Sequence, residues 1–364
     1  MHHKSNCFLV ILGMMALAAV LAAGGCATNS GQAIDLYVDA VALNEMEQEQ
    51  AAIEKLNQAV AVNKSFSLAY SLLGEIYMKI QEYDNSAAAL EKATELNPWS
   101  FKDFFNLGRV YELMERFAEA VRAYSRAVEL EPQDVQANIG AARSYYKLDD
   151  YQNASLYAGQ AEQLAPNAGE VHELLGDIYG KTQDYEQAIA SYKRALELES
   201  DDPDTMNSLA VAYLRTKRPS PAYELLKSVI QMQPDNKQAY KYLGYTALVL
   251  YLEDKNAYEA ELQSASPDEV MVESLQRSMT NYLVESVASY AKSVESDEQD
   301  WDAHRGLGVA YIWKATAGRD TIDQEMKEKA LYHWKRSLEI NPQQTYRETL
   351  LQNIRIYSRQ SSAG

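Results

Sequence analysis

The feature that most constrains this chain is a repeat with a period of 34 residues. One register begins at Ala33 and runs without insertion through Asn236, which divides this stretch into six repeats. Residues of the same kind recur at the same place in successive repeats, as Gly74 and Gly108 do. Self-similarity of this length indicates a chain built from stacked copies of one small unit, in which each copy contacts its neighbours.

The pattern inside each repeat predicts two antiparallel helices. Apolar residues recur at spacings of three and four, which places their side chains on one face of a helix. Glycine or alanine at the eighth position and alanine at the twentieth allow helix backbones to approach closely. Tyrosines fill the wider gaps, where their hydroxyls reach water or a hydrogen-bond partner. A proline near the end of most repeats stops the second helix.

The pattern is densest in residues 101–134. This repeat carries Phe104, Leu107, Gly108, Tyr111, Phe117, Ala120, Tyr124, Ala127, Leu130 and Pro132. These residues resemble the consensus of the tetratricopeptide-repeat family, and the resemblance covers nearly all of the chain after residue 32. It implies an all-α fold, namely a right-handed superhelical solenoid of about eight helix-turn-helix repeats with a C-terminal capping helix.

The regular register ends at Asn236, and three further regions follow. Residues 237–300 form a seventh repeat. The pattern of its second helix begins about 30 residues later than the 34-residue period requires, so we expect an inserted helical hairpin over 248–280. The sequence from Ser266 to Glu269 predicts a helix start inside this hairpin. Residues 301–342 form an eighth repeat with an insertion of about ten residues, where Thr321 and Gln324 suggest a capping box. Residues 343–364 are expected to be the capping helix and tail.

The N-terminus predicts an export signal. A short polar start containing Lys4 precedes an apolar run over residues 8–23, which is shorter than the roughly 20 residues of a membrane-spanning helix. Gly24, Gly25 and Cys26 then resemble the end of a bacterial lipoprotein signal. The resemblance implies a signal peptide at 1–25, lipidation of Cys26 and a short linker over 26–32. Cleavage with secretion and an uncleaved anchor are the alternatives.

No catalytic constellation emerges from the sequence. Of the five histidines, His172 and His304 occupy a repeat position that normally holds a large core side chain, and His333 stands alone. There is no phosphate-binding loop, metal-ligand spacing or nucleophile motif. We therefore expect no enzyme activity, metal or cofactor. The net charge of −18 argues against nucleic acid as a partner, and it favours either simple solubility or attraction to a basic partner.

The family resemblance also implies a binding groove. Positions two, five, nine, twelve and thirteen of each repeat tend to face the groove in this family. The groove residues identified in the third and fourth repeats are Lys102, Phe105, Arg109, Ile139, Arg143, Tyr146 and Lys147. Four cations in an acidic chain predict a site for an acidic or C-terminal carboxylate segment, held by charge-assisted hydrogen bonds and stacking. Alternatively, these cations pair with neighbouring acids such as Glu112.

Together these features predict a membrane-anchored scaffold that binds other proteins or peptides. The alanine after Cys26 implies, by the same resemblance, an outer-membrane lipoprotein that faces the periplasm. We expect a role in envelope assembly, of the pilus, secretin or outer-membrane type. The alternative is an accessory regulator of an envelope enzyme such as a peptidoglycan hydrolase. The sequence leaves the partner and the oligomeric state open.

Overall fold

The computed structural model describes residues 27–359, except residue 200 and residues 319–320. The predicted signal peptide, Cys7 and Cys26 lie outside the described residues. The described residues form seventeen helices and no strand, so the fold is all-α. The chain divides into two compact units, Met1–Pro166 and Asn167–Gly364. None of the helices in the described ranges is both long and apolar enough to cross a membrane.

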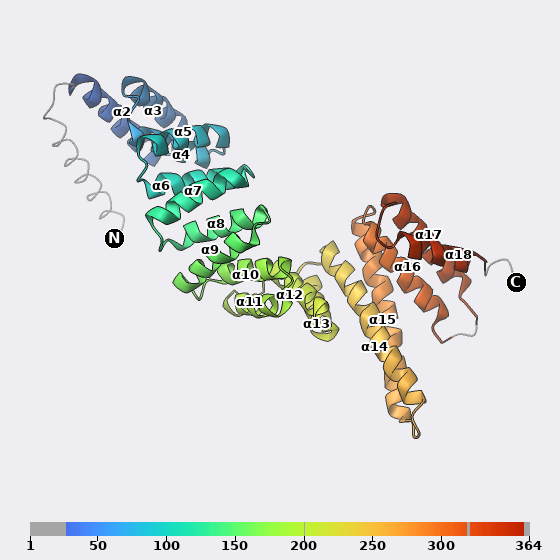
Figure 1. Ribbon diagram of the computed structural model, residues 1–364. Coiled ribbons are helices and arrows are strands. Elements are labelled where there is room, and N and C mark those ends of the chain that lie inside the picture. The colour runs from blue at the N-terminus through green and yellow to red at the C-terminus, as the bar shows by residue number, and fades with distance from the viewer. Residues whose placement is uncertain (1–26, 200, 319–320, 360–364) are drawn as a thin grey trace. The chain divides into compact units, whose positions relative to one another are not determined.

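The first unit is a stack of four helix pairs (Figure 1). Its helices are α2 (Ala27–Glu45), α3 (Glu49–Val62), α4 (Ser67–Lys79), α5 (Tyr83–Leu96), α6 (Phe101–Leu113), α7 (Phe117–Leu130), α8 (Val135–Lys147) and α9 (Tyr151–Leu164). Each helix contacts its partner in the pair, and the second helix contacts the first helix of the next pair. The first helix already begins at Ala27, so it includes most of the segment that we expected to form a linker.

The second unit contains four more pairs and a final single helix. Its helices are α10 (Gly169–Lys181), α11 (Tyr185–Leu198), α12 (Pro203–Arg215), α13 (Pro219–Met232), α14 (Lys237–Leu262), α15 (Glu269–Ser296), α16 (Trp301–Thr316), α17 (Gln324–Ile340) and α18 (Arg347–Arg359). The final helix packs its Leu350 against the eighth pair, where Trp334 and Ile312 are also buried. The last pair is thus covered on the side where no further repeat follows.

The turn inside each of the first six pairs has the same backbone form. One residue in each turn has a positive φ between 56° and 65°, although none of them is glycine; they are Glu47, Gln81, Glu115, Asp149, Gln183 and Lys217. The residue after it donates its backbone N–H to a carbonyl oxygen of the first helix. For example, Arg116 N donates to Tyr111 O at 2.8 Å. A left-handed residue just after a helix is a common way to end it.

The seventh pair, α14 and α15, is much longer than the others. Figure 1 shows the two helices side by side, with their shared turn projecting beyond the rest of the unit. Their bases nevertheless make the hydrogen bonds of ordinary repeats. Ser286 Oγ donates to Gly244 O at 2.9 Å, as Ser86 Oγ donates to Gly74 O at 2.6 Å in the second repeat. The inserted residues therefore leave the packing at the base of the pair unchanged.

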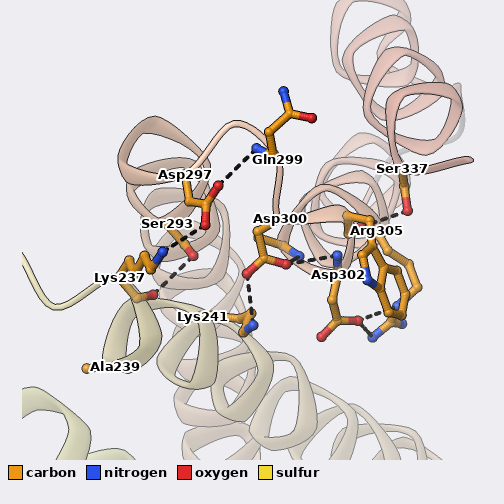
Figure 2. A network of polar contacts seen from close by, with 12 residues as sticks. Lys237, Ala239, Lys241, Ser293, Asp297, Gln299, Asp300, Asp302, Arg305 and Ser337 are labelled. Carbon is orange, nitrogen blue, oxygen red and sulfur yellow. Dashed lines mark hydrogen bonds and ion pairs between the residues drawn. The ribbon is translucent and has the colours of Figure 1, made fainter. Parts of the chain in front are cut away.

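Polar contacts around the α15–α16 loop hold the base of this pair (Figure 2). Lys237 Nζ lies 2.8 Å from Asp297 Oδ2, and Lys241 Nζ lies 2.8 Å from Asp300 Oδ2. Asp300 also caps α16, because its Oδ1 accepts the backbone N–H groups of Asp302 and Ala303. The start of α14 is in this way tied to the loop that begins the eighth pair.

Both helix starts predicted in the insertions are wrong in detail. In the long pair, Asp268 is the N-cap of α15 and accepts the N–H groups of Val270 and Met271, so neither Ser266 nor Pro267 begins the helix. In the eighth pair the N-cap of α17 is Asp323, whose side chain accepts Met326 N, rather than Thr321. In both cases a carboxylate directly before the helix is the better acceptor for its free N–H groups.

Candidate binding pocket between α6 and α8

The two first helices that carry the predicted groove residues, α6 and α8, are neighbours in the first unit. Together with one side chain from α7 they enclose an open pocket of about 270 Å³. Its lining residues are Phe105, Arg109, Glu112, Leu113, Tyr124, Gln136, Gly140 and Arg143. The pocket holds two guanidinium groups and one carboxylate, so its formal net charge is positive in a strongly acidic chain.

Tyr124 forms the floor of the pocket. Its buried ring lies between Gly108 of α6 and Gly140 of α8, where an added Cβ would come within 2.7 Å and 2.5 Å of ring atoms. The two helices can flank one aromatic ring only because both positions lack a side chain. Burial, and then the charge of Glu112, raise the pKa of the Tyr124 hydroxyl far above its usual value. The hydroxyl therefore stays protonated and donates to Glu112 Oε2 at 2.8 Å.

Two of the four predicted cations are ion-paired. Arg143 Nη1 lies 3.2 Å from Glu112 Oε1, so this carboxylate receives hydrogen bonds from both Arg143 and Tyr124. Lys102 Nζ lies 2.6 Å from Glu75 Oε1 of α4. For these two residues the alternative explanation, pairing with a neighbouring acid, is correct.

Arg109 and Lys147 differ from this pair. Both are exposed, and neither makes an ion pair within the part of the chain that the structure describes. The Arg109 guanidinium lies 5.9 Å from the centre of the Phe105 ring, which also lines the pocket. Lys147 lies at the last residue of α8, outside the lining. Arg109 is therefore the one predicted cation that both faces the pocket and makes no ion pair among the described residues.

The structure brings together three of the seven predicted groove residues. Phe105, Arg109 and Arg143 line the pocket, whereas Lys102, Tyr146 and Lys147 lie on the same two helices outside it; Tyr146 instead contacts the Tyr151 ring. The prediction that Ile139 faces the groove is wrong, because its side chain is only 1% exposed.

Several lining residues were not among the predicted groove residues, although Glu112 was named from the sequence as an alternative ion-pair partner of the cations. Glu112, Leu113 and Gln136 occupy positions twelve, thirteen and two of their repeats, so the same positional rule would have found them. Tyr124 and Gly140 stand at packing positions, and no such signal pointed to them.

A second site in the other unit corrects the prediction about His333. Its Nδ1 lies 2.8 Å from Nδ1 of His304, so the two histidines form a pair across α16 and α17. His304 Nε2 lies 3.2 Å from the carbonyl oxygen of Glu298. No group of three or more metal-ligating side chains comes together within the described ranges.

The comparisons with known proteins agree with this architecture. Three tetratricopeptide-repeat family models match the chain, at residues 68–98, 101–134 and 176–217. The chain is a tetratricopeptide-repeat protein. Proteins of this family generally bind other proteins or peptides and generally are not enzymes. No curated protein sequence matches the chain.

Two solved structures resemble the chain over most of its length. The crystal structure of a tetratricopeptide-repeat protein from Parabacteroides merdae covers 77% of this chain and 99% of its own, with 11% identity and a TM-score of 0.50. The crystal structure of the APC/C hetero-tetramer Cut9–Hcn1 covers 87% of this chain with 15% identity and a TM-score of 0.51. This chain spans about half of that relative, 55%. Such similarity establishes the fold alone.

Proposed function

We propose that this protein is a membrane-anchored scaffold that captures an acidic segment of a partner protein in the α6–α8 pocket. The observation that carries the proposal is Arg109, a cation that lines a pocket of about 270 Å³ and has no ion-pair partner among the described residues. A carboxylate of the partner would complete this pair. The anchoring part of the proposal rests on the sequence of residues 24–26, and the role in envelope assembly follows from that anchor.

The surroundings of Arg109 specify the ligand further. Arg143 shares Glu112 with Tyr124, so its guanidinium is held in place in the lining of the pocket and adds positive charge beside Arg109. Gln136 adds an amide donor, and Phe105 and Leu113 supply apolar surface beside the charge. This combination suits an acidic side chain with an apolar neighbour in the sequence. It also suits a C-terminal carboxylate that is preceded by an apolar residue.

The test uses Arg109→Glu and a matched control, Lys147→Glu, which makes the same charge change on the neighbouring helix outside the pocket. Arg143 is a poorer choice, because Arg143→Glu would place two carboxylates together at Glu112. The probe is a fluorescent peptide rich in glutamate with a free C-terminal carboxylate, and its binding is measured by fluorescence anisotropy. Losing one charge-assisted contact should weaken the affinity roughly 10- to 100-fold.

The control variant should bind nearly as well as the wild-type protein, and wild-type affinity should fall as salt is raised. Both variants should melt like the wild-type protein, because neither side chain is buried. Equal affinity of Arg109→Glu and wild-type protein for the peptide would show that the pocket does not bind carboxylates.

A further inference from the structure

The long pair α14 and α15 carries a segment that contributes little to the core. We define the arm as residues 252–282. No residue in the arm is buried, whereas Tyr251 and Leu283 at its base are both buried in the core of the unit. The two helical halves of the arm contact each other, for example through the hydrogen bond from Ser278 Oγ to Asp254, and Tyr282 at the base also contacts the Tyr223 ring of α13.

The arm is not required to close its repeat. The base already makes the Ser286–Gly244 hydrogen bond of an ordinary repeat, and the Tyr290 ring packs against Gly244 and Gly306 there. Met279 and Tyr282, next to the base, are partly buried and pack against the core cluster, but the rest of the arm adds length without adding core. Its contribution must therefore lie in what it presents to the outside.

The end of the arm presents apolar side chains. Leu262, Val270 and Met271 are 50%, 78% and 44% exposed. They lie at the same turn, because α14 ends at Leu262, α15 begins at Glu269, and Asp268 N donates to Glu261 Oε1 at 2.8 Å. We call this patch of three apolar residues the tip. Clustered exposed apolar residues that are rimmed by charge mark interaction surfaces.

The arm is acidic, and four of its acids, Glu261, Asp268, Glu269 and Glu273, lie close to the tip. The arm contains seven acidic residues against two basic ones, a net charge of −5; the acids are Glu253, Asp254, Glu259, Glu261, Asp268, Glu269 and Glu273. Lys255 pairs with Glu259 at 3.7 Å. Among the described residues, Glu253, Glu269 and Glu273 have neither a hydrogen-bond nor an ion-pair partner for their side chains. The field at the tip is therefore negative, with the unpaired carboxylates of Glu269 and Glu273 next to the apolar patch.

We propose that the tip is a second docking site, which binds a basic amphipathic helix of a partner protein. The apolar face of that helix covers Leu262, Val270 and Met271, and its lysines or arginines meet Glu269 and Glu273. A second copy of this arm does not fit, because two surfaces of charge −5 repel each other at short range. An anionic lipid surface is disfavoured for the same reason. This site is independent of the α6–α8 pocket and takes a ligand of opposite charge.

The experiment uses a synthetic peptide of about 18 residues with leucines at helical spacings i, i+3, i+4 and i+7 and lysines on the opposite face. A second peptide carries glutamates in place of the lysines. Binding to the full chain is measured by fluorescence anisotropy. The tip variant is Val270→Ser with Met271→Ser. The matched control is Leu156→Ser with Leu164→Ser, which changes two leucines on α9 that are 55% and 39% exposed.

We expect the tip variant to weaken binding of the lysine peptide by at least about tenfold, since two apolar contacts are lost. The control pair should change it by less than about twofold, and Arg109→Glu should leave it unchanged. Hydrogen exchange should slow in residues 262–274 when the peptide is bound. Equal affinity of the tip variant and the control, or equal binding of the glutamate peptide, would overturn the proposal. So would sedimentation showing a dimer that the tip variant abolishes, because the occupant would then be a second copy.

Discussion

At the scale of single residues, the close packing of Tyr124 against Gly108 and Gly140 makes a sharp prediction. Gly140→Ala would place a methyl group 2.5 Å from the ring, which is buried and cannot easily move. The overpacking should cost about 1–3 kcal/mol, which exceeds the gain of up to about 1 kcal/mol from replacing a helical glycine. The variant should therefore melt at a lower temperature than the wild-type protein.

Gly159→Ala is the matched control for this substitution. Gly159 lies inside the neighbouring helix α9, and an added Cβ would meet nothing within 4 Å. Only the higher helix propensity of alanine over glycine then acts, so this variant should melt at a slightly higher temperature than the wild-type protein. The two glycine substitutions should thus have opposite signs in thermal denaturation followed by circular dichroism. A gain in melting temperature for both would mean that the ring of Tyr124 can move away.

The His304–His333 pair predicts a dependence of stability on pH. The carbonyl of Glu298 can only accept, which assigns the proton of His304 to Nε2, so that its Nδ1 accepts from His333 Nδ1. Burial, and then the nearby His304, lower the pKa of His333 to about 4, and burial lowers the pKa of His304. As pH falls below about 6.5, His333 becomes protonated in the unfolded chain but stays neutral in the folded chain. The free energy of unfolding therefore falls between pH 6.5 and 4.

The His333→Gln variant measures this effect. At pH 5 the wild-type protein should have lost on the order of 1 kcal/mol through His333, after allowance for solvent screening. The variant lacks this titration, so its melting temperature should fall less between pH 7.5 and pH 5. The difference between the two slopes cancels the contribution of the groups outside the His304–His333 pair. Parallel slopes would contradict the assignment of a strongly lowered pKa to His333.

At the scale of elements, the arm and the final helix should differ in their contribution to stability. Replacing residues 255–277 with a short glycine-rich turn removes no buried side chain. The melting temperature should then change by less than about 3 °C. Removing α18 instead uncovers Trp334 and removes the buried Leu350, which should lower it by about 5 °C or more. A large loss of stability on shortening the arm would make the arm part of the core.

At the scale of the whole molecule, lipidation of Cys26 should decide where the protein resides. Cys26→Ser should release the protein into the soluble fraction or leave its signal uncleaved, which slows its migration on a denaturing gel. Cys7→Ser is the matched control, because Cys7 falls within the predicted signal and is removed with it. Membrane fractionation and gel migration identical for wild-type protein and Cys26→Ser would exclude the lipid anchor.

The fold could be predicted because each contact that defines it is local in the sequence. Gly108 and Tyr124 belong to one repeat, and Gly140 belongs to the next, so the recurring pattern of small and aromatic residues already encodes how adjacent helices pack. Even the second helix of the seventh repeat could be predicted after its insertion, because Ser286 and Tyr290 occupy ordinary repeat positions. In a stack of like units, recognising the unit is nearly the same as recognising the fold.

The binding site could be predicted from the sequence only in part. The positional rule placed Arg109 and Arg143 on the correct surface, but it could not tell which cation was already neutralised. Glu112 and Arg143 lie 31 residues apart, and so their pairing depends on how two helices from different repeats are oriented. The contact between His304 and His333 was missed for the same reason, since these residues lie on two helices separated by an insertion.

The sequence by itself determined the repeat, the helices and the class of protein, because the helical spacing of apolar and small residues acts over a few turns. Only the tertiary structure decided which charges are paired, which apolar residues stay exposed and which carboxylate caps each inserted helix. These features depend on distances of a few ångströms between side chains of different helices. The position of a residue in its repeat indicates the helix face on which it lies. The side chain that it contacts there is decided by how the helices pack.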